Sequence, residues 1–156
     1  MNKREVNKGT DTKPAASALS EMDKKLIAAA TEAINRRYRD EWQEVGAAML
    51  TRDGRIITGV NIDAYLGRIA VCAEAIAIGR AITEHGDHGI ETMVAVRHPK
   101  PGEPGKIAVV SPCGICRELI HDYDAKAKVI VPDQGQPPKV VSIGELLPNK
   151  YKRGSE

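Results

Sequence analysis

Apolar residues recur at helical spacing over residues 20–39, between polar and charged positions. The apolar positions are Leu26, Ala30, Ala33, Ile34 and Tyr38. They fall on one face of a helix, which predicts an amphipathic helix that packs this face on a core. Ser20, which is followed by acidic residues, has the chemistry of an N-cap, so the helix is expected to begin there and to end near Arg39.

Three later segments are also expected to be helical. Residues 72–85 are apolar on most sides, which predicts a deeply buried helix, and Gly86 is a typical helix stop. Residues 113–122 are expected to form another helix. Residues 143–147 predict a short helix that ends at Pro148, because proline cannot continue a helix.

Short apolar runs between these segments predict strands. The first two, residues 45–51 and 56–60, flank Asp53-Gly54, a typical signal for a hairpin turn. Gly59 within the second strand indicates a bulge or a close approach of another backbone. Further strands are expected at residues 92–96, 128–131 and 140–142, with a turn over 133–138 and a short strand or extended segment at 107–110.

This order of elements predicts the α/β class. We expect a three-layer α/β/α sandwich around a five-stranded mixed sheet, with helices on both faces. Residues 20–152 are expected to form one domain. The polar segment 1–19 cannot bury enough apolar surface to become ordered, and it is expected to be a disordered N-terminal tail, with 153–156 as a flexible C-terminal tail.

Composition excludes several classes of function. The chain has 156 residues, 42% of them hydrophobic and 28% charged, which is ordinary for a globular domain. A net charge of +2, no phenylalanine and one tryptophan argue against nucleic-acid binding. No apolar run approaches the roughly 18 residues of a membrane span, and no signal segment is visible, so a cytoplasmic protein without a membrane partner is expected.

All three cysteines lie in two short motifs, Cys72-Ala73-Glu74 and Pro112-Cys113-Gly114-Ile115-Cys116. Zinc accepts thiolate ligands in tetrahedral geometry, and a catalytic zinc keeps three protein ligands and one open position. The three cysteines match such an open site. Both motifs open predicted helices, whose N-termini stabilise thiolates.

Two alternative interpretations of the cysteines are buried structural thiols and a structural zinc site. A structural zinc needs a fourth protein ligand. The chain has no fourth cysteine, and its histidines are not at short motif spacing from any cysteine: they are His85, His88, His98 and His121. The open catalytic site is therefore favoured.

The chain resembles the cytidine deaminase family, and within it the blasticidin S deaminase branch. The residues that carry the resemblance are Gly54–Asn61, Cys72–Glu74, Ser111–Leu119 and Glu145–Pro148. The resemblance extends from about Met22 to about Tyr151. It implies the same α/β fold and one zinc ion per subunit, held by the three cysteines.

The resemblance also implies roles for individual residues. Glu74 is expected to act as the proton shuttle. Asn61 is expected to grip the sugar hydroxyls together with Asp63, which stands where the family usually has glutamate. The backbone of Ala73 is expected to contact the amino group or ring carbonyl of the base. The shorter acid at Asp63 argues that a standard ribose clamp should not be assumed.

Three more residues carry open alternatives. Trp42 either packs on the base or fastens the first helix, and Tyr65 lines either the active site or a subunit contact. Arg117 either offsets the charge of the thiolates or is a solvated helix residue. Many cytidine deaminases have arginine directly after the catalytic glutamate, whereas this chain has Ala75, as the blasticidin branch does.

The resemblance implies a zinc-dependent aminohydrolase that converts cytidine or deoxycytidine into the uracil nucleoside and ammonia. The expected mechanism is attack of zinc-bound hydroxide on C4, with Glu74 moving protons. The first alternative is a blasticidin S deaminase, favoured by Ala75 and by the Leu-Leu-Pro ending. A non-catalytic zinc protein is the alternative of another class, and an intact Glu74 counts against it. A small-molecule nucleoside and a homotetramer are the expected partners.

Overall fold

The computed structural model describes residues 18–154, so most of the predicted N-terminal tail and the last two residues lie outside the described part of the chain. Its helices are α1 (Glu21–Arg37), η1 (Gly67–Ile69), α2 (Ala73–His85), α3 (Gly114–Tyr123) and α4 (Ile143–Leu146). Its strands are β1 (Val45–Thr51), β2 (Ile56–Val60), β3 (Ile90–Arg97), β4 (Ala108–Val110), β5 (Lys128–Asp133) and β6 (Gln136–Ser142). None of the described helices is long and apolar enough to cross a membrane.

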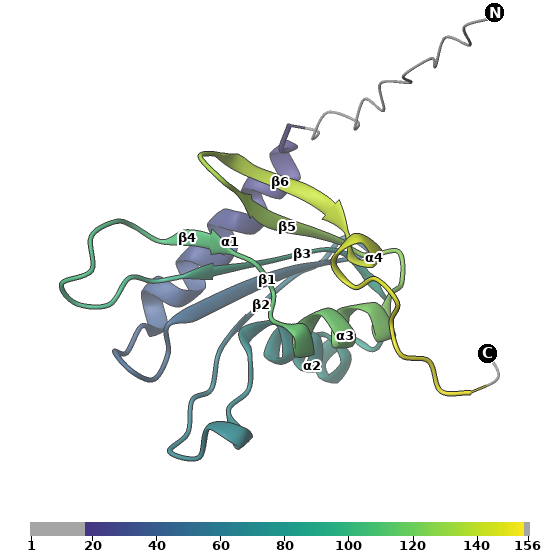
Figure 1. Cartoon of the computed structure of the whole chain (residues 1–156), viewed down its shortest axis with the longest axis horizontal. Coiled ribbons are helices and arrows are strands. Elements are labelled where there is room, and N and C mark those ends of the chain that lie inside the picture. Colours follow the sequence, from purple (N-terminus) through teal and green to yellow (C-terminus); the bar gives the residue numbers. More distant parts are fainter. Residues whose placement is uncertain (1–17, 155–156) are drawn as a thin grey trace, which may run out of the picture.

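The strands form a mixed sheet in the order β2-β1-β3-β5-β6, as Figure 1 shows. The pair β3–β5 is parallel and the other neighbours in this row are antiparallel. The predicted five-stranded mixed sheet is confirmed. The segment predicted as a strand or extended stretch is a strand, β4, which pairs with β3 outside the row.

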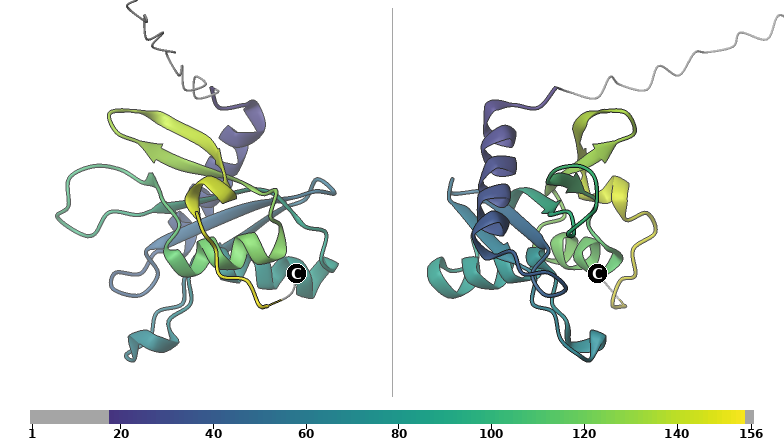
Figure 2. Two further views of the ribbon diagram at one scale, coloured as in Figure 1. Left: turned by 45° about the vertical axis from the view of Figure 1, so that its right-hand side comes forward. Right: turned by 90° about the vertical axis from the view of Figure 1, so that its left-hand side faces the viewer.

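Alternation along the strands divides the core into two layers. Ala47 and Met49 of β1 pack with apolar residues of α2 and α3, whereas Ala48, between them, packs with residues of α1. Successive side chains of a strand point to opposite faces of a sheet, so the helices must lie on both faces. Figure 2 shows α1 and α3 on opposite sides of the strands. The three-layer sandwich is confirmed.

Helix α1 begins as its sequence predicts. The side chain of Ser20 accepts a hydrogen bond from the backbone N–H of Asp23, whose carboxylate binds the backbone N–H of Ser20 in return. This capping box satisfies N–H groups that have no partner within the helix. The helix ends at Arg37, two residues before the predicted end.

Gly59 allows another backbone to approach β2 closely, which is one of the two structures predicted for this glycine; the other was a bulge. A Cβ atom at this position would lie 2.5 Å from the backbone oxygen of Ala73 and 2.6 Å from the backbone nitrogen of Ala77. Only a residue without a side chain allows β2 to contact the backbone of α2 so closely. The first turn of α2, and with it the cysteine motif, is thereby seated directly on the sheet.

The turn predicted over residues 133–138 is shorter in the structure, because both of its ends belong to strands. Asp133 pairs with Gln136, so the turn consists of residues 134–135, and Pro137 and Pro138 belong to β6. Proline usually interrupts a sheet because it lacks an N–H donor, but β6 is an edge strand of the row, where proline is tolerated.

Candidate metal centre and its pocket

Two helix N-termini bring the cysteines together. Cys72 is the N-cap of α2, Cys113 is the N-cap of α3, and Cys116 lies in the first turn of α3. Figure 1 shows α2 and α3 side by side against the same face of the sheet. Their shared direction places the two N-termini next to each other, although the motifs are some forty residues apart.

The three sulfur atoms have the spacing of a tetrahedral metal site. The Sγ atoms of Cys72 and Cys113 are 3.6 Å apart, and all three Sγ atoms lie within 4.8 Å of one another. Zinc–sulfur bonds of 2.3 Å in tetrahedral geometry require sulfur atoms about 3.8 Å apart. Among the described residues, these three cysteines are the group of possible ligands close enough to share one metal ion, so a fourth position is left for a water molecule or a substrate.

The thiols differ in burial and in acidity. Burial, together with the charge of Glu74, raises the pKa of the Cys116 thiol, and burial also raises the pKa of Cys72. Partial burial acts in the same direction at Cys113, but the backbone N–H of Cys116 and the side chain of Cys72 outweigh it and lower the Cys113 pKa. A divalent cation among the sulfurs would favour all three thiolates, so these residues fit zinc.

Glu74 is held beside the sulfur atoms in the first turn of α2. Only 4% of its surface is exposed, and burial raises the pKa of its carboxyl, opposed by its own backbone N–H and by the Cys116 side chain. It is not part of the ligand group. A buried carboxyl with a raised pKa next to an open metal position is suited to taking up and releasing a proton.

A cavity of about 380 Å³ opens in front of the metal centre. Its lining includes two of the three cysteines, Glu74 and three of the five predicted substrate-binding residues: Asn61, Asp63 and Ala73. The structure therefore brings together residues from the loop after β2, from the start of α2 and from the start of α3. We call this cavity the catalytic pocket.

Trp42 and Tyr65 are not among the residues that line the catalytic pocket. They lie in an adjoining cavity of about 190 Å³ together with Glu41, Ala64 and Asp63, which also lines the catalytic pocket. The rings of Trp42 and Tyr65 meet edge to face with centroids 5.3 Å apart. Contact of Trp42 with the base stays a prediction.

Asn61 makes hydrogen bonds that its predicted role did not include. Its Oδ1 atom accepts hydrogen bonds of 2.9 Å from the backbone N–H groups of both Glu44 and Val45, and its Nδ2 atom donates to the backbone oxygen of Trp42 at 2.8 Å. The side chain thus ties the segment before β1 to the end of β2. These three hydrogen bonds use only one of the two hydrogen atoms on Nδ2. Contact of Asn61 with the sugar stays a prediction.

The guanidinium of Arg117 is directed to the loop before Cys113. It donates to the backbone oxygens of Pro112 and Leu146 and to the hydroxyl of Ser111. Arg117 therefore holds the metal-binding loop to the end of α4. The hydrogen bonds of the guanidinium go to these oxygen atoms rather than to sulfur, and its balancing of thiolate charge stays a prediction.

Sequence reasoning missed several residues of the pocket. Val45, Ile62, Ser111 and Ile115 line it. Ile115 lies between two ligands and Ser111 lies two residues before one, so proximity to the cysteines was an available signal. Val45 carries no such signal, because only the pairing of β1 with the residues around Asn61 places it there.

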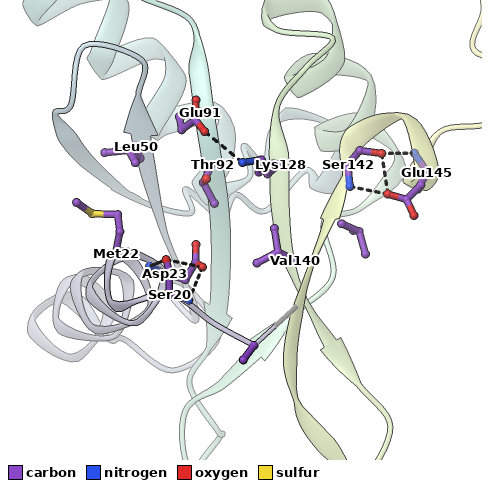
Figure 3. Close-up of a pocket in the computed structure, with 12 residues that line it drawn as sticks. Ser20, Met22, Asp23, Leu50, Glu91, Thr92, Lys128, Val140, Ser142 and Glu145 are labelled. Carbon is purple, nitrogen blue, oxygen red and sulfur yellow. Dashed lines mark hydrogen bonds and ion pairs between the residues drawn. The ribbon is translucent and has the colours of Figure 1, made fainter. Parts of the chain in front are cut away.

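A third cavity, of about 470 Å³, lies between the start of α1 and β6 (Figure 3). Its polar side chains are engaged with one another: Ser20 with Asp23, Ser142 with Glu145, and Lys128 with Glu91. These are helix caps and a surface ion pair. The arrangement stabilises the ends of elements and presents no reactive group.

Comparison with known proteins agrees with the geometry of the cysteines. The family described as "Cytidine and deoxycytidylate deaminase zinc-binding region" matches residues 20–132. Blasticidin-S deaminase from Bacillus cereus is 48% identical over 136 residues, which cover 86% of this chain and 96% of that protein. Cytidine deaminase from Halalkalibacterium halodurans is 30% identical over 109 residues, 69% of this chain and 76% of that protein.

Solved structures of the same kind share the fold. Cytidine deaminase from Mycobacterium leprae matches with a TM-score of 0.66 at 27% identity, covering 81% of this chain and 97% of that one. Cytidine deaminase from Bacillus anthracis matches with a TM-score of 0.70, covering 84% and 90%; at 21% identity it supports the fold alone.

Proposed function

Because the chain belongs to the cytidine and deoxycytidylate deaminase family, as a zinc-dependent aminohydrolase with three cysteine ligands, we propose that it deaminates a cytosine nucleoside of the blasticidin S type. The observation that carries the proposal is the 48% identity over 96% of a blasticidin-S deaminase, against 30% over 76% of a cytidine deaminase. This reverses the order favoured by sequence analysis, and cytidine or deoxycytidine becomes the second candidate.

The reaction replaces the amino group on C4 of the ring with a carbonyl oxygen from water and releases ammonia. Zinc, when bound by Cys72, Cys113 and Cys116, lowers the pKa of a water molecule and so supplies a nucleophile at neutral pH. The three cysteines would hold the metal beside the catalytic pocket, whose wall includes Cys72 and Cys113. The helix N-termini that carry them help to stabilise three negative ligands on one divalent ion.

Glu74 moves the protons that this exchange requires. Its carboxylate accepts one proton from the attacking water and donates it to ring N3. It then takes the second proton from the hydroxyl group on C4, which becomes the carbonyl oxygen, and delivers it to the departing amine. Both directions need a carboxyl whose pKa lies closer to neutrality than usual, and burial acts in that direction. The wall around Glu74 excludes bulk water, because the residue is almost entirely buried.

The remaining residues orient the substrate. The backbone of Ala73 lies between a ligand and the proton shuttle, where it can hydrogen-bond the base. Asn61 and Asp63 line the same pocket as the metal ligands Cys72 and Cys113 and are the proposed contacts of the sugar. Arg117 is proposed to offset thiolate charge in addition to holding the metal loop.

We propose that the chain forms a homo-oligomer, with a tetramer as the expected state. Apolar side chains are exposed on the loop around η1 and beside it: Leu66 is 70% exposed, Ile69 64% and Ile115 77%. Figure 1 shows this loop extending away from the sheet. Such side chains next to the catalytic pocket support burial against another copy. Thiolate ligands also support a cytoplasmic location, where cysteines stay reduced.

Turnover measurements test the proposal. Zinc-loaded wild-type protein and Glu74→Gln are assayed with blasticidin S, cytidine and deoxycytidine by loss of cytosine absorbance and by ammonia release. We expect wild-type turnover of blasticidin S and a loss of at least about 10²-fold in Glu74→Gln, because the proton shuttle is removed. Glu84→Gln, on the same helix, is the matched control and should keep full activity. Zinc binding without turnover of any substrate would overturn the proposal.

A further inference from the structure

The cavity that adjoins the catalytic pocket has aromatic and acidic walls. Its lining residues are Glu41, Trp42, Asp63, Ala64 and Tyr65. Two of the five are carboxylates, two are aromatic and none is basic. Asp63 also lines the catalytic pocket, so the two cavities meet at this residue. We call the smaller cavity the aromatic side cavity.

In the aromatic pair of this cavity, Tyr65 is open to solvent, whereas Trp42 is half-buried and already contacts a cation. Tyr65 is 96% exposed although its ring packs edge to face on Trp42. The guanidinium of Arg39 lies over the Trp42 ring, 5.0 Å from its centroid. Aromatic faces bind guanidinium and ammonium groups through their quadrupole, and neighbouring carboxylates add to the attraction.

The position of the cavity relative to the metal fixes what can enter it. In a bound nucleoside the base must reach Glu74 and the cysteines, which leaves the sugar toward Asn61 and Asp63. A substituent on the far side of the sugar then points past Asp63 into the aromatic side cavity. Its volume of about 190 Å³ is half that of the catalytic pocket, enough for a short arm with a terminal charged group.

The walls of the cavity are held in place before any ligand arrives. Asn61 binds the backbone oxygen of Trp42 and the backbone N–H groups of the two residues that follow Gln43. Glu41 has a φ of 60°, and its backbone N–H donates to the carboxylate of Glu44. Since an ordered wall loses little conformational entropy on binding, this arrangement favours recognition.

We propose that the aromatic side cavity is a specificity subsite for a cationic group, a guanidinium or an ammonium, carried on the sugar of a cytosine nucleoside. Trp42 and Tyr65 supply aromatic faces, and Glu41 and Asp63 supply negative charge. The subsite selects charged nucleosides over cytidine. This inference rests on the proposed function for the placement of the base, and it names the substrate class of the same site.

The sole tryptophan of the chain lies in the subsite, so its fluorescence reports binding there without turnover. Blasticidin S, a cytosine nucleoside with a guanidinium-bearing arm, and cytidine are titrated into zinc-loaded Glu74→Gln protein. Trp42 fluorescence is followed for blasticidin S, and the heat of binding is measured for both ligands, because cytidine does not fill the subsite. Glu41→Gln is added to remove one charge of the subsite. Asp40→Asn is the matched control, because Asp40 is the neighbouring residue and binds the Tyr38 hydroxyl outside the cavity.

We expect Glu41→Gln to weaken blasticidin S binding about three- to fivefold, as loss of an ionic contact with an exposed carboxylate should, and to leave cytidine binding within about 1.5-fold. Asp40→Asn should change neither. The blasticidin S affinity should also fall with added salt more steeply than the cytidine affinity. Equal effects of Glu41→Gln on both ligands, or none on either, would overturn the subsite.

Failure of the subsite and failure of the proposed function give different results. Charge-dependent binding of blasticidin S by a protein that does not deaminate it would leave the subsite standing and remove the proposed reaction. Turnover of blasticidin S with an affinity insensitive to Glu41→Gln would do the reverse. Melting temperatures of all variants are measured in parallel, and a destabilised Glu41→Gln is replaced by Glu41→Asn, which also removes the charge and tolerates the positive φ at this position.

Discussion

Single residues in this protein often serve the catalytic pocket through the backbone of another segment. Asn61 fixes the segment from Trp42 to Val45, and Arg117 fixes the loop that contains Pro112. The grouping of the three cysteines was predictable from sequence because metal chemistry restricts both residue type and spacing, whereas proton transfer by Glu74 stays a prediction. The partners of Asn61 were not, since they lie sixteen to nineteen residues away and depend on strand pairing.

Replacing Asn61 with alanine should destabilise the protein and loosen the segment that carries Trp42. Two backbone N–H groups and one backbone oxygen would lose their partner, which should lower the free energy of unfolding by about 1–3 kcal/mol. Denaturant titration measures the loss, and a red shift of Trp42 fluorescence should accompany it. Asn35→Ala, on the exposed side of α1, is the control and should stay within about 0.5 kcal/mol of wild type. Wild-type stability of Asn61→Ala would contradict this account.

At the scale of elements, the site depends on how closely α2 and α3 approach the sheet and each other. The helix starts were predictable because their caps are local, whereas β6 was predicted too short because Pro137 and Pro138 usually break strands. Its place at the edge of the sheet, which makes the prolines tolerable, is a property of the topology. The functional consequence is clearest at Gly59, where β2 meets the backbone of α2.

Gly59→Ala should displace the start of α2, which carries Cys72 and Glu74. The added methyl group has no space, and overpacking of this kind costs about 1–3 kcal/mol of stability. We expect a lower melting temperature and weaker zinc retention against a chelator. Gly79→Ala, in the same helix with nothing within 4 Å of the added atom, should instead be neutral or stabilising. Equal behaviour of the two variants would contradict the role of close approach.

Asp124, at the end of α3, connects this helix to the turn between β1 and β2 and to β3. It should make the free energy of unfolding depend on pH. Its carboxylate accepts two hydrogen bonds from Arg52, at 2.6 and 3.0 Å, and others from the backbone N–H groups of Ile90 and Lys126. The Arg52 bonds are the main cause that lowers the pKa of Asp124. Asp124→Asn should therefore reduce the free energy of unfolding by about 1–3 kcal/mol at pH 7.

The sign of the pH effect follows from the direction of the Asp124 pKa shift. A carboxyl whose folded pKa lies below its unfolded value of about 3.9 contributes stability that is present above that value and is lost as pH falls through the folded pKa. The difference between wild type and Asp124→Asn should therefore shrink below about pH 4. Denaturant titrations at pH 7 and pH 3 measure it, and an unchanged difference would contradict the assignment.

At the scale of the whole molecule, the metal centre links two helices that the chain connects only through β3 and β4. The α/β class, the mixed sheet and the three layers followed from the order and periodicity of the segments. The side cavity did not, because it is formed by the segment before β1 and the loop after β2, whose proximity is a feature of the folded sheet.

Removal of the metal should destabilise the whole domain. A ligand that binds only the folded state stabilises it by mass action, and three cysteines from two helices are such a binding site. We expect a chelator to lower the melting temperature by at least about 5 °C and to abolish activity, with both restored by stoichiometric zinc. Cys116→Ser should have the low melting temperature and the lost activity of the chelated protein. An unchanged melting temperature of the wild-type protein in the presence of the chelator would contradict a zinc centre.

The central claim is that this zinc site acts on a charged cytosine nucleoside in preference to cytidine. The most direct measurement is a competition assay in which zinc-loaded wild-type protein receives equimolar blasticidin S and cytidine, with both uracil products quantified. The account predicts a kcat/KM for blasticidin S at least about tenfold higher, equivalent to about 1.4 kcal/mol of transition-state discrimination. Equal or faster turnover of cytidine would contradict the account and return the chain to conventional cytidine deamination.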